Sequence, residues 1–128
     1  MGYMRHHAIV VTGSYDLWPE RAYEKAEELL SQWRDSTHEP QPVLSQLSEE
    51  CMNGRRSFCV FPDGSKEGWP TSEAGDEFRD RLIRWLEEQR YEDGSSPLAW
   101  VEVQYADDER ETKVCRHSDA LLATESEE

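Results

Sequence analysis

The sequence predicts a single α+β domain over residues 1–120, a two-layer sandwich. A mostly antiparallel sheet of four or five strands carries two helices on one face. The hydrophobic period indicates the order strand, helix, strand, helix, strand, strand. The chain has 128 residues, enough for one modest core but not for two. Stacking both helices on the sheet is the economical way to bury these apolar faces, and it leaves the other sheet face partly open.

The N-terminal third predicts a strand followed by a helix. Residues His7–Thr12 are few, apolar and rich in β-branched side chains, which is typical of a central, buried strand. Pro19 then suits a first helical turn, where a missing N–H costs no hydrogen bond. Apolar residues at helical spacing predict a helix over residues 17–34. They are Ala22, Ala26, Leu29, Leu30 and Trp33.

A long polar connection over residues 35–54 joins this helix to the next strand. Within it, Val43–Leu47 favours a short strand or a turn. The side chains of Arg56–Phe61 alternate as in a second strand, and Pro62–Ser65 closes that strand as a turn.

A second helix is predicted to begin at Thr71 or Ser72. Its apolar stripe consists of Phe78, Leu82, Trp85 and Leu86. Its exposed side has acidic and basic residues four positions apart, and such pairs each contribute a few tenths of a kcal/mol. The two pairs are Glu77 with Arg81 and Asp80 with Arg84.

The C-terminal part predicts a hairpin and an acidic tail. Residues Trp100–Tyr105 alternate between two faces, and Thr112–His117 returns beside them after a turn over 106–111. One face carries Val101, Val103 and Tyr105, and the other carries Trp100, Glu102 and Gln104. Residues 121–128 form the tail, which we expect to be disordered.

The charge balance narrows the classes of partner. Twenty-eight acidic residues against fourteen basic ones give a net charge of −14, which repels nucleic acid. The acidic surface either keeps the protein soluble or mimics DNA and blocks a nuclease. The longest apolar run, Ala8–Val11, is far too short to cross a membrane. The three cysteines are odd in number and have no regular spacing, which indicates free thiols. Thiols stay free in a reducing compartment, so we expect a cytoplasmic protein.

No motif indicates catalysis, so the sequence predicts a protein that is not an enzyme and uses no cofactor. Phosphate-binding glycine loops and the nucleophile elbow are absent. For a metal, the only hints are the neighbours His6 and His7 and the pair Cys115 and His117. Paired spacings typical of zinc sites do not occur, so no metal site is predicted. Cys59 and Cys115 each lie in a predicted strand, where a cysteine usually serves as a small, buried apolar residue.

Residues Asn53–Trp69 hold the best candidate ligand site. Arg55, Arg56 and Lys66 bracket one strand, Ser65 adds a hydroxyl group, and Trp69 offers a ring for stacking. Guanidinium groups suit phosphate and an aromatic face suits a base, which predicts nucleotide-like binding. The alternative is structural: the arginines neutralise nearby glutamates and the tryptophan packs over a loop.

Several segments together resemble a group of small phage and prophage proteins over most of residues 6–118. They are His6–Thr12, Arg56–Phe58, Pro62–Trp69, Arg90–Pro97, Trp100–Tyr105 and Asp107–Asp108. Within that group the chain is most similar to the first Thoeris anti-defence family. Those proteins capture cyclic ADP-ribose signals of bacterial immunity without turnover.

The resemblance implies a homo-oligomer in the infected bacterial cell that sequesters a cyclic nucleotide signal. Phosphates would meet arginine or lysine, and the adenine would stack on a ring. The resemblance adds Arg110 to the basic residues that could meet a phosphate, and Phe58 to the aromatic rings that could stack on the adenine. The predicted ligand-binding set is therefore Arg55, Arg56, Phe58, Ser65, Lys66, Trp69 and Arg110. The alternative function is an acidic, DNA-mimicking inhibitor of a host defence nuclease.

Overall fold

The computed structural model describes residues 7–14, 17–37, 43–62, 70–105 and 112–118. In these ranges the chain forms one antiparallel sheet of order β2-β1-β3-β4 and two long helices. The strands are β1 (His7–Gly13), β2 (Arg56–Val60), β3 (Leu98–Gln104) and β4 (Lys113–His117), and the helices are α1 (Trp18–Thr37) and α2 (Pro70–Glu88). The predicted α+β fold is confirmed, with a sheet of four strands.

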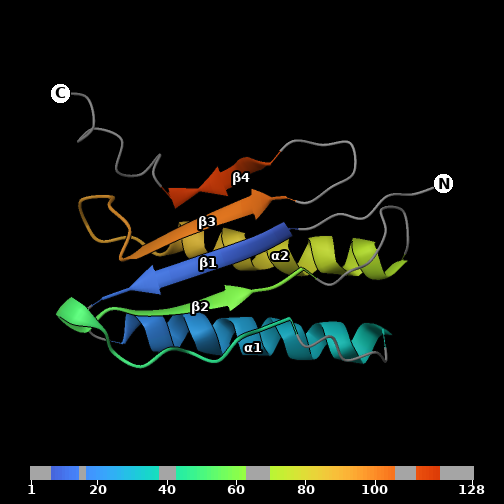
Figure 1. Cartoon of the computed structure of the whole chain (residues 1–128), viewed down its shortest axis with the longest axis horizontal. Coiled ribbons are helices and arrows are strands. Elements are labelled where there is room, and N and C mark those ends of the chain that lie inside the picture. The colour runs from blue at the N-terminus through green and yellow to red at the C-terminus, as the bar shows by residue number, and fades with distance from the viewer. Residues whose placement is uncertain (1–6, 15–16, 38–42, 63–69, 106–111, 119–128) are drawn as a thin grey trace.

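Both helices lie on one face of the sheet, as Figure 1 shows. The core between the two layers draws on every element except β4, with Ile9 of β1 and Leu82 of α2 fully buried. Strand β1 lies between β2 and β3, which confirms its predicted central place. Apolar side chains on facing layers exclude water from each other, and this burial holds the sandwich together.

The alternation predicted in β3 is present, and it fixes which side chains face the helices. Trp100, Glu102 and Gln104 are buried on the helix side, at 4%, 3% and 3% exposure. Val101 and Val103 lie half-buried on the opposite face. The more polar of the two faces is therefore the buried one, which places a carboxylate inside the molecule.

The two edges of the sheet differ. Beyond β2, the connection supplies hydrogen bonds in place of a full strand: Ser45 N donates to Cys59 O at 2.9 Å and Ser48 N to Ser57 O at 2.9 Å. The hydroxyl oxygens of the same two serines accept from Cys59 N and Ser57 N, both at 2.9 Å. At the other edge, no further strand lies beside β4 in the ranges that the structure describes.

The element boundaries differ slightly from the prediction. Helix α2 begins at Pro70, so Thr71 and Ser72 lie inside its first turn rather than before it. A proline suits the first position because its backbone angle is already helical. The predicted turn at 106–111 and tail at 121–128 lie outside the described residues. None of the described helices has the length and apolar character that crossing a bilayer requires.

Candidate functional site: an ionic recess

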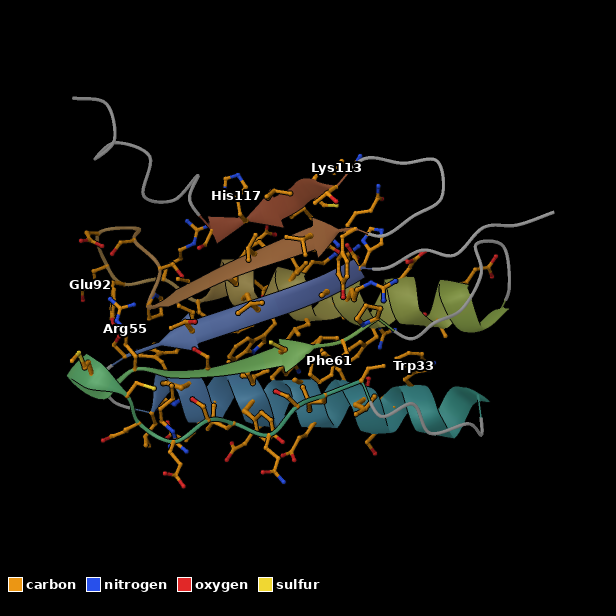
Figure 2. The ribbon with its side chains drawn as sticks, in the orientation of Figure 1. Trp33, Arg55, Phe61, Glu92, Lys113 and His117 are labelled. Atoms are coloured by element: carbon orange, nitrogen blue, oxygen red, sulfur yellow. The ribbon has the colours of Figure 1, made fainter. Side chains whose placement is uncertain are left out.

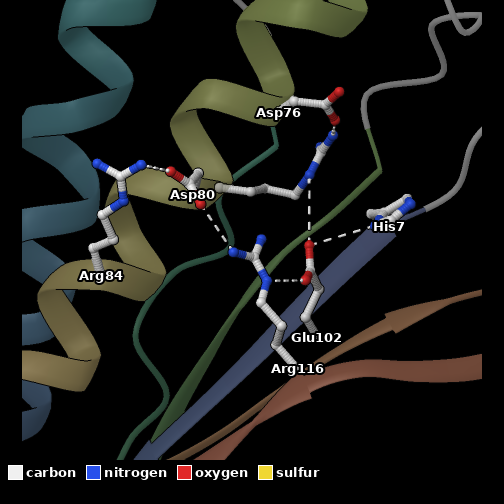
Figure 3. Close-up of polar contacts among 7 residues, drawn as sticks. His7, Asp76, Asp80, Arg84, Glu102 and Arg116 are labelled. Atoms are coloured by element: carbon white, nitrogen blue, oxygen red, sulfur yellow. Dashed lines mark hydrogen bonds and ion pairs between the residues drawn. The ribbon is translucent and has the colours of Figure 1, made fainter.

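A buried carboxylate lies where β1 begins and β3 ends. The Glu102 Oε1 atom accepts a 2.7 Å hydrogen bond from Arg116 Nε. The Oε2 atom lies 3.4 Å from His7 Nδ1 and 4.0 Å from Arg79 Nε. Burying an ionised carboxylate is costly unless opposite charges and hydrogen bonds compensate it. Basic side chains from β1, α2 and β4 do so here, as Figure 3 shows for His7 and Arg116.

Each of the two arginines is in turn matched by an aspartate of α2. Arg79 Nη2 donates to Asp76 Oδ1 at 2.5 Å, and Arg116 Nη1 donates to Asp80 Oδ1 at 3.0 Å. Arg84 pairs with the other oxygen of Asp80 at 2.7 Å, as predicted from the sequence spacing. Two of these three contacts lie within α2, whereas the Arg116–Asp80 pair joins α2 to β4, as Figure 3 shows.

The network borders a recess of about 470 Å³, a size in the range of small-molecule sites. We call it the ionic recess, and it is lined by His7, Asp76, Glu77, Arg79, Asp80, Glu102 and Arg116. Its wall holds two guanidinium groups and four carboxylates. Arg81 and Arg84 pair with two of these carboxylates from outside the recess, so the whole array is close to neutral.

The buried network shifts the pKa values of Glu102 and Arg116. Burial by itself raises the pKa of Glu102, but hydrogen bonds and positive charge from His7 and Arg116 outweigh it and lower the pKa from 4.5 to about 2. The hydrogen bond to Glu102 in turn raises the pKa of Arg116. Glu102 and Arg116 therefore each stabilise the charged form of the other.

An irregularity in β4 brings a thiol beside the carboxylate. Glu102 pairs with Arg116 and Val103 pairs with Val114, so Cys115 is an additional residue between the two. A β-bulge of this kind redirects a side chain. Ligand atoms of His7, Glu102 and Cys115 lie within 4.8 Å of one another. In the described part of the chain, no other group of histidine, cysteine and carboxylate side chains is as compact.

The predicted arginines lie at the other end of the sheet. Arg56 pairs with Gly13, the last residue of β1, whereas His7 is the first, so roughly 20 Å of strand separates them. Arg55 is exposed there, as Figure 2 shows. Arg56 is half-buried, forms an ion pair with Glu20 and donates to Ser48 O at 2.9 Å. The structural alternative raised for the arginine pair thus holds for Arg56.

The ring of Phe58 belongs to the core. It is 2% exposed and packs edge-on against Tyr23, with ring centroids 5.3 Å apart. A ligand on the surface cannot stack on it. Ser65, Lys66, Trp69 and Arg110 lie outside the described residues, so the structure brings together only Arg55 and Arg56 of the predicted set.

A second hollow, of about 270 Å³, lies between α1 and α2. Trp33 and Phe78 form part of its wall, with ring centroids 5.5 Å apart, and Arg81 and Gln32 are joined by a 3.2 Å hydrogen bond across it. Both rings are at most 5% exposed. Because they offer little surface to a ligand, the ionic recess is the better candidate site.

The sequence contains weak signals for the recess that the prediction missed. Arg79 precedes the buried Ile83 by four positions, so it lies on the core-facing row of α2. Glu102 alternates with the buried Leu98 and Trp100, so it shares their face of β3. A charged residue at such a position indicates a buried ion pair. His7, Arg116 and Glu102 come together only in the folded chain.

No protein-family model matches the sequence, and neither a curated protein nor a solved structure matches it. The ionic recess and the resemblance described above therefore carry the functional proposal.

Proposed function

We propose that the protein binds a small anionic ligand at the ionic recess and does not convert it. The observation that carries this proposal is the convergence of Arg79, Arg116 and His7, from three separate elements, on one carboxylate. The same donors suit a phosphate group. The Arg116 side chain is 38% exposed and so is reachable by a ligand, whereas that of Arg79 is 6% exposed.

The resemblance to Thoeris anti-defence proteins supplies the ligand class to test first, a cyclic ADP-ribose signal. The protein would then sequester an immune messenger inside a phage-infected bacterium. The net charge of −14 opposes any anionic ligand at long range. Binding therefore depends on short-range hydrogen bonds, and within the described residues Arg116 is the exposed donor at the recess.

Isothermal titration calorimetry with cyclic ADP-ribose isomers tests this proposal. We expect sub-micromolar binding of one isomer, and about tenfold or greater weakening in Arg116→Gln because a hydrogen bond to a charged group is lost. Arg84→Gln is the matched control: its guanidinium also contacts Asp80, but it does not reach Glu102. It should leave the affinity unchanged.

The ligand should also be recovered intact when the complex is denatured after long incubation. If no cyclic ADP-ribose isomer gives heat on titration, this class of ligand is ruled out. A product in the chromatogram would make the protein an enzyme. If Arg116→Gln and Arg84→Gln weaken the affinity for the ligand equally, the recess is ruled out as the binding site.

The outward faces of the helices favour the second candidate, an inhibitor of a basic defence nuclease. Exposed carboxylates lie there on both α1 and α2: Glu24, Glu27, Glu28, Glu73, Glu87 and Glu88. Such a surface binds basic proteins with a strong dependence on salt. Capture from host lysate at low salt should enrich a nuclease that elutes as salt rises. Enrichment without any nucleic-acid-binding protein would count against this candidate.

A further inference from the structure

We propose that the protein holds one zinc ion through His7, Glu102 and Cys115. The three side chains come from the neighbouring strands β1, β3 and β4. Imidazole nitrogen, carboxylate oxygen and thiolate sulfur are the three ligand types that zinc takes in proteins. This proposal goes beyond ligand capture at the recess and stands without it, since its test uses the metal alone.

The spacing of the His7 and Glu102 ligand atoms suits a tetrahedral ion. All three ligand atoms lie within 4.8 Å of one another. With metal–ligand bonds of about 2.0–2.2 Å, two ligands of a tetrahedral zinc ion are about 3.4 Å apart. His7 Nδ1 and Glu102 Oε2 are 3.4 Å apart, which is long for a hydrogen bond to a carboxylate. This pair therefore already has the separation that a shared ion requires.

The bulge in β4 explains how the thiol reaches the site. In a regular strand, consecutive residues point to opposite faces of the sheet. Here Arg116 contacts Glu102 at 2.7 Å, and the adjacent Cys115 also brings its sulfur close to Glu102. The register shift after Glu102 supplies the additional residue that permits both. Bulges recur beside functional sites because they redirect a side chain in this way.

The surroundings of Glu102 match those of a metal-binding carboxylate. Arg116 holds Oε1, and this leaves Oε2, with its longer contacts, directed toward His7. Ligating carboxylates are commonly held by such an outer hydrogen bond. The positive charge of Arg79, 4.0 Å from Oε2, is balanced by Asp76. An ion at this point therefore does not meet an uncompensated positive charge.

Three protein ligands leave the fourth position of a tetrahedral zinc ion open. His7 and Glu102 also line the ionic recess, so we expect that position to face it. Because the array of carboxylates and guanidiniums is nearly neutral, a dication bound with one thiolate adds a single positive charge. An anionic oxygen suits both that charge and the open position.

Cobalt(II) substitution tests the site on the full chain after treatment with a chelator. We expect one cobalt ion per chain and a near-ultraviolet thiolate-to-cobalt absorption band. The band should be lost in Cys115→Ser. His7→Gln should weaken cobalt binding by more than the roughly 10- to 100-fold typical of losing an outer partner. Zinc should displace the cobalt and remove the band.

Cys59→Ser is the matched control, because Cys59 is also a half-buried cysteine on a strand but lies outside the cluster. It should retain the band and the affinity. Circular dichroism of each metal-free variant checks that it is folded. A wild-type chain without the band, or a band that persists in Cys115→Ser and disappears in Cys59→Ser, overturns the assignment.

Discussion

Replacing Glu102 by alanine should lower the free energy of unfolding by about 3–5 kcal/mol, the usual effect of removing one partner from a buried ion pair. The variant leaves the Arg79 side chain, 6% exposed, and the buried His7 without the carboxylate between them. Urea denaturation followed by tryptophan fluorescence measures the loss, since Trp33 and Trp100 are buried in the native state.

Glu77→Ala is the matched control for this substitution. Glu77 also contributes to the recess and forms a 2.7 Å ion pair with Arg81, but its side chain is 62% exposed. Exposed pairs contribute at most about 1 kcal/mol, so this variant should remain close to wild type. If both variants unfold at the same urea concentration, the buried network contributes no more than a surface pair.

The pH dependence of unfolding gives a second measure of the Glu102 network. The pKa of Glu102 falls from 4.5 to about 2 in the folded state, so the unfolded chain binds its proton first as the pH drops. The stabilisation, on the order of 3 kcal/mol, is complete above pH 4.5 and is lost as the pH approaches 2. Glu102→Gln should therefore lose less stability than wild type across this window.

Replacing Phe58 by alanine should cost about 3–5 kcal/mol of stability, because a buried aromatic ring leaves a cavity. The ring is 2% exposed and packs against Tyr23. The same denaturation experiment measures the change. This result would place Phe58 in the core and not among the residues that meet a ligand.

Phe61 offers a control of the same residue type. It follows β2 by one position and is 46% exposed, so Phe61→Ala should change stability by about 0.5 kcal/mol or less. Figure 2 shows it near the end of that strand. A Phe58→Ala variant as stable as Phe61→Ala would contradict the core position and restore the ring as a ligand candidate.

Local periodicity predicted the order of the elements and most of their boundaries. The central β1 strand and the i,i+4 pairs of α2 depend on short-range spacing, which can be read from a sequence. For the burial of Glu102 the same kind of spacing gives a weak signal only. Alternation in β3 separates two faces, but it does not say which one meets the helices. The apolar Val101 and Val103 face away from them.

The candidate site was missed because its members are distant in sequence. His7 and Glu102 are separated by 95 positions, and Arg116 and Asp80 by 36. The hints for a metal came as neighbouring pairs in the sequence, yet the structure brings together one member of each, His7 and Cys115. A bulge has no spacing signature, so the approach of Cys115 to Glu102 is visible only in three dimensions.

The unequal edges of the sheet determine how copies of the chain could join. Ser45 and Ser48 occupy backbone groups along the outer edge of β2, so a further strand cannot pair directly with β2. Among the described residues no strand lies outside β4, so two copies that joined there about a two-fold axis would form one continuous sheet. The outer strands of such a pair would both be β2, whose outward backbone groups are already bonded to Ser45 and Ser48.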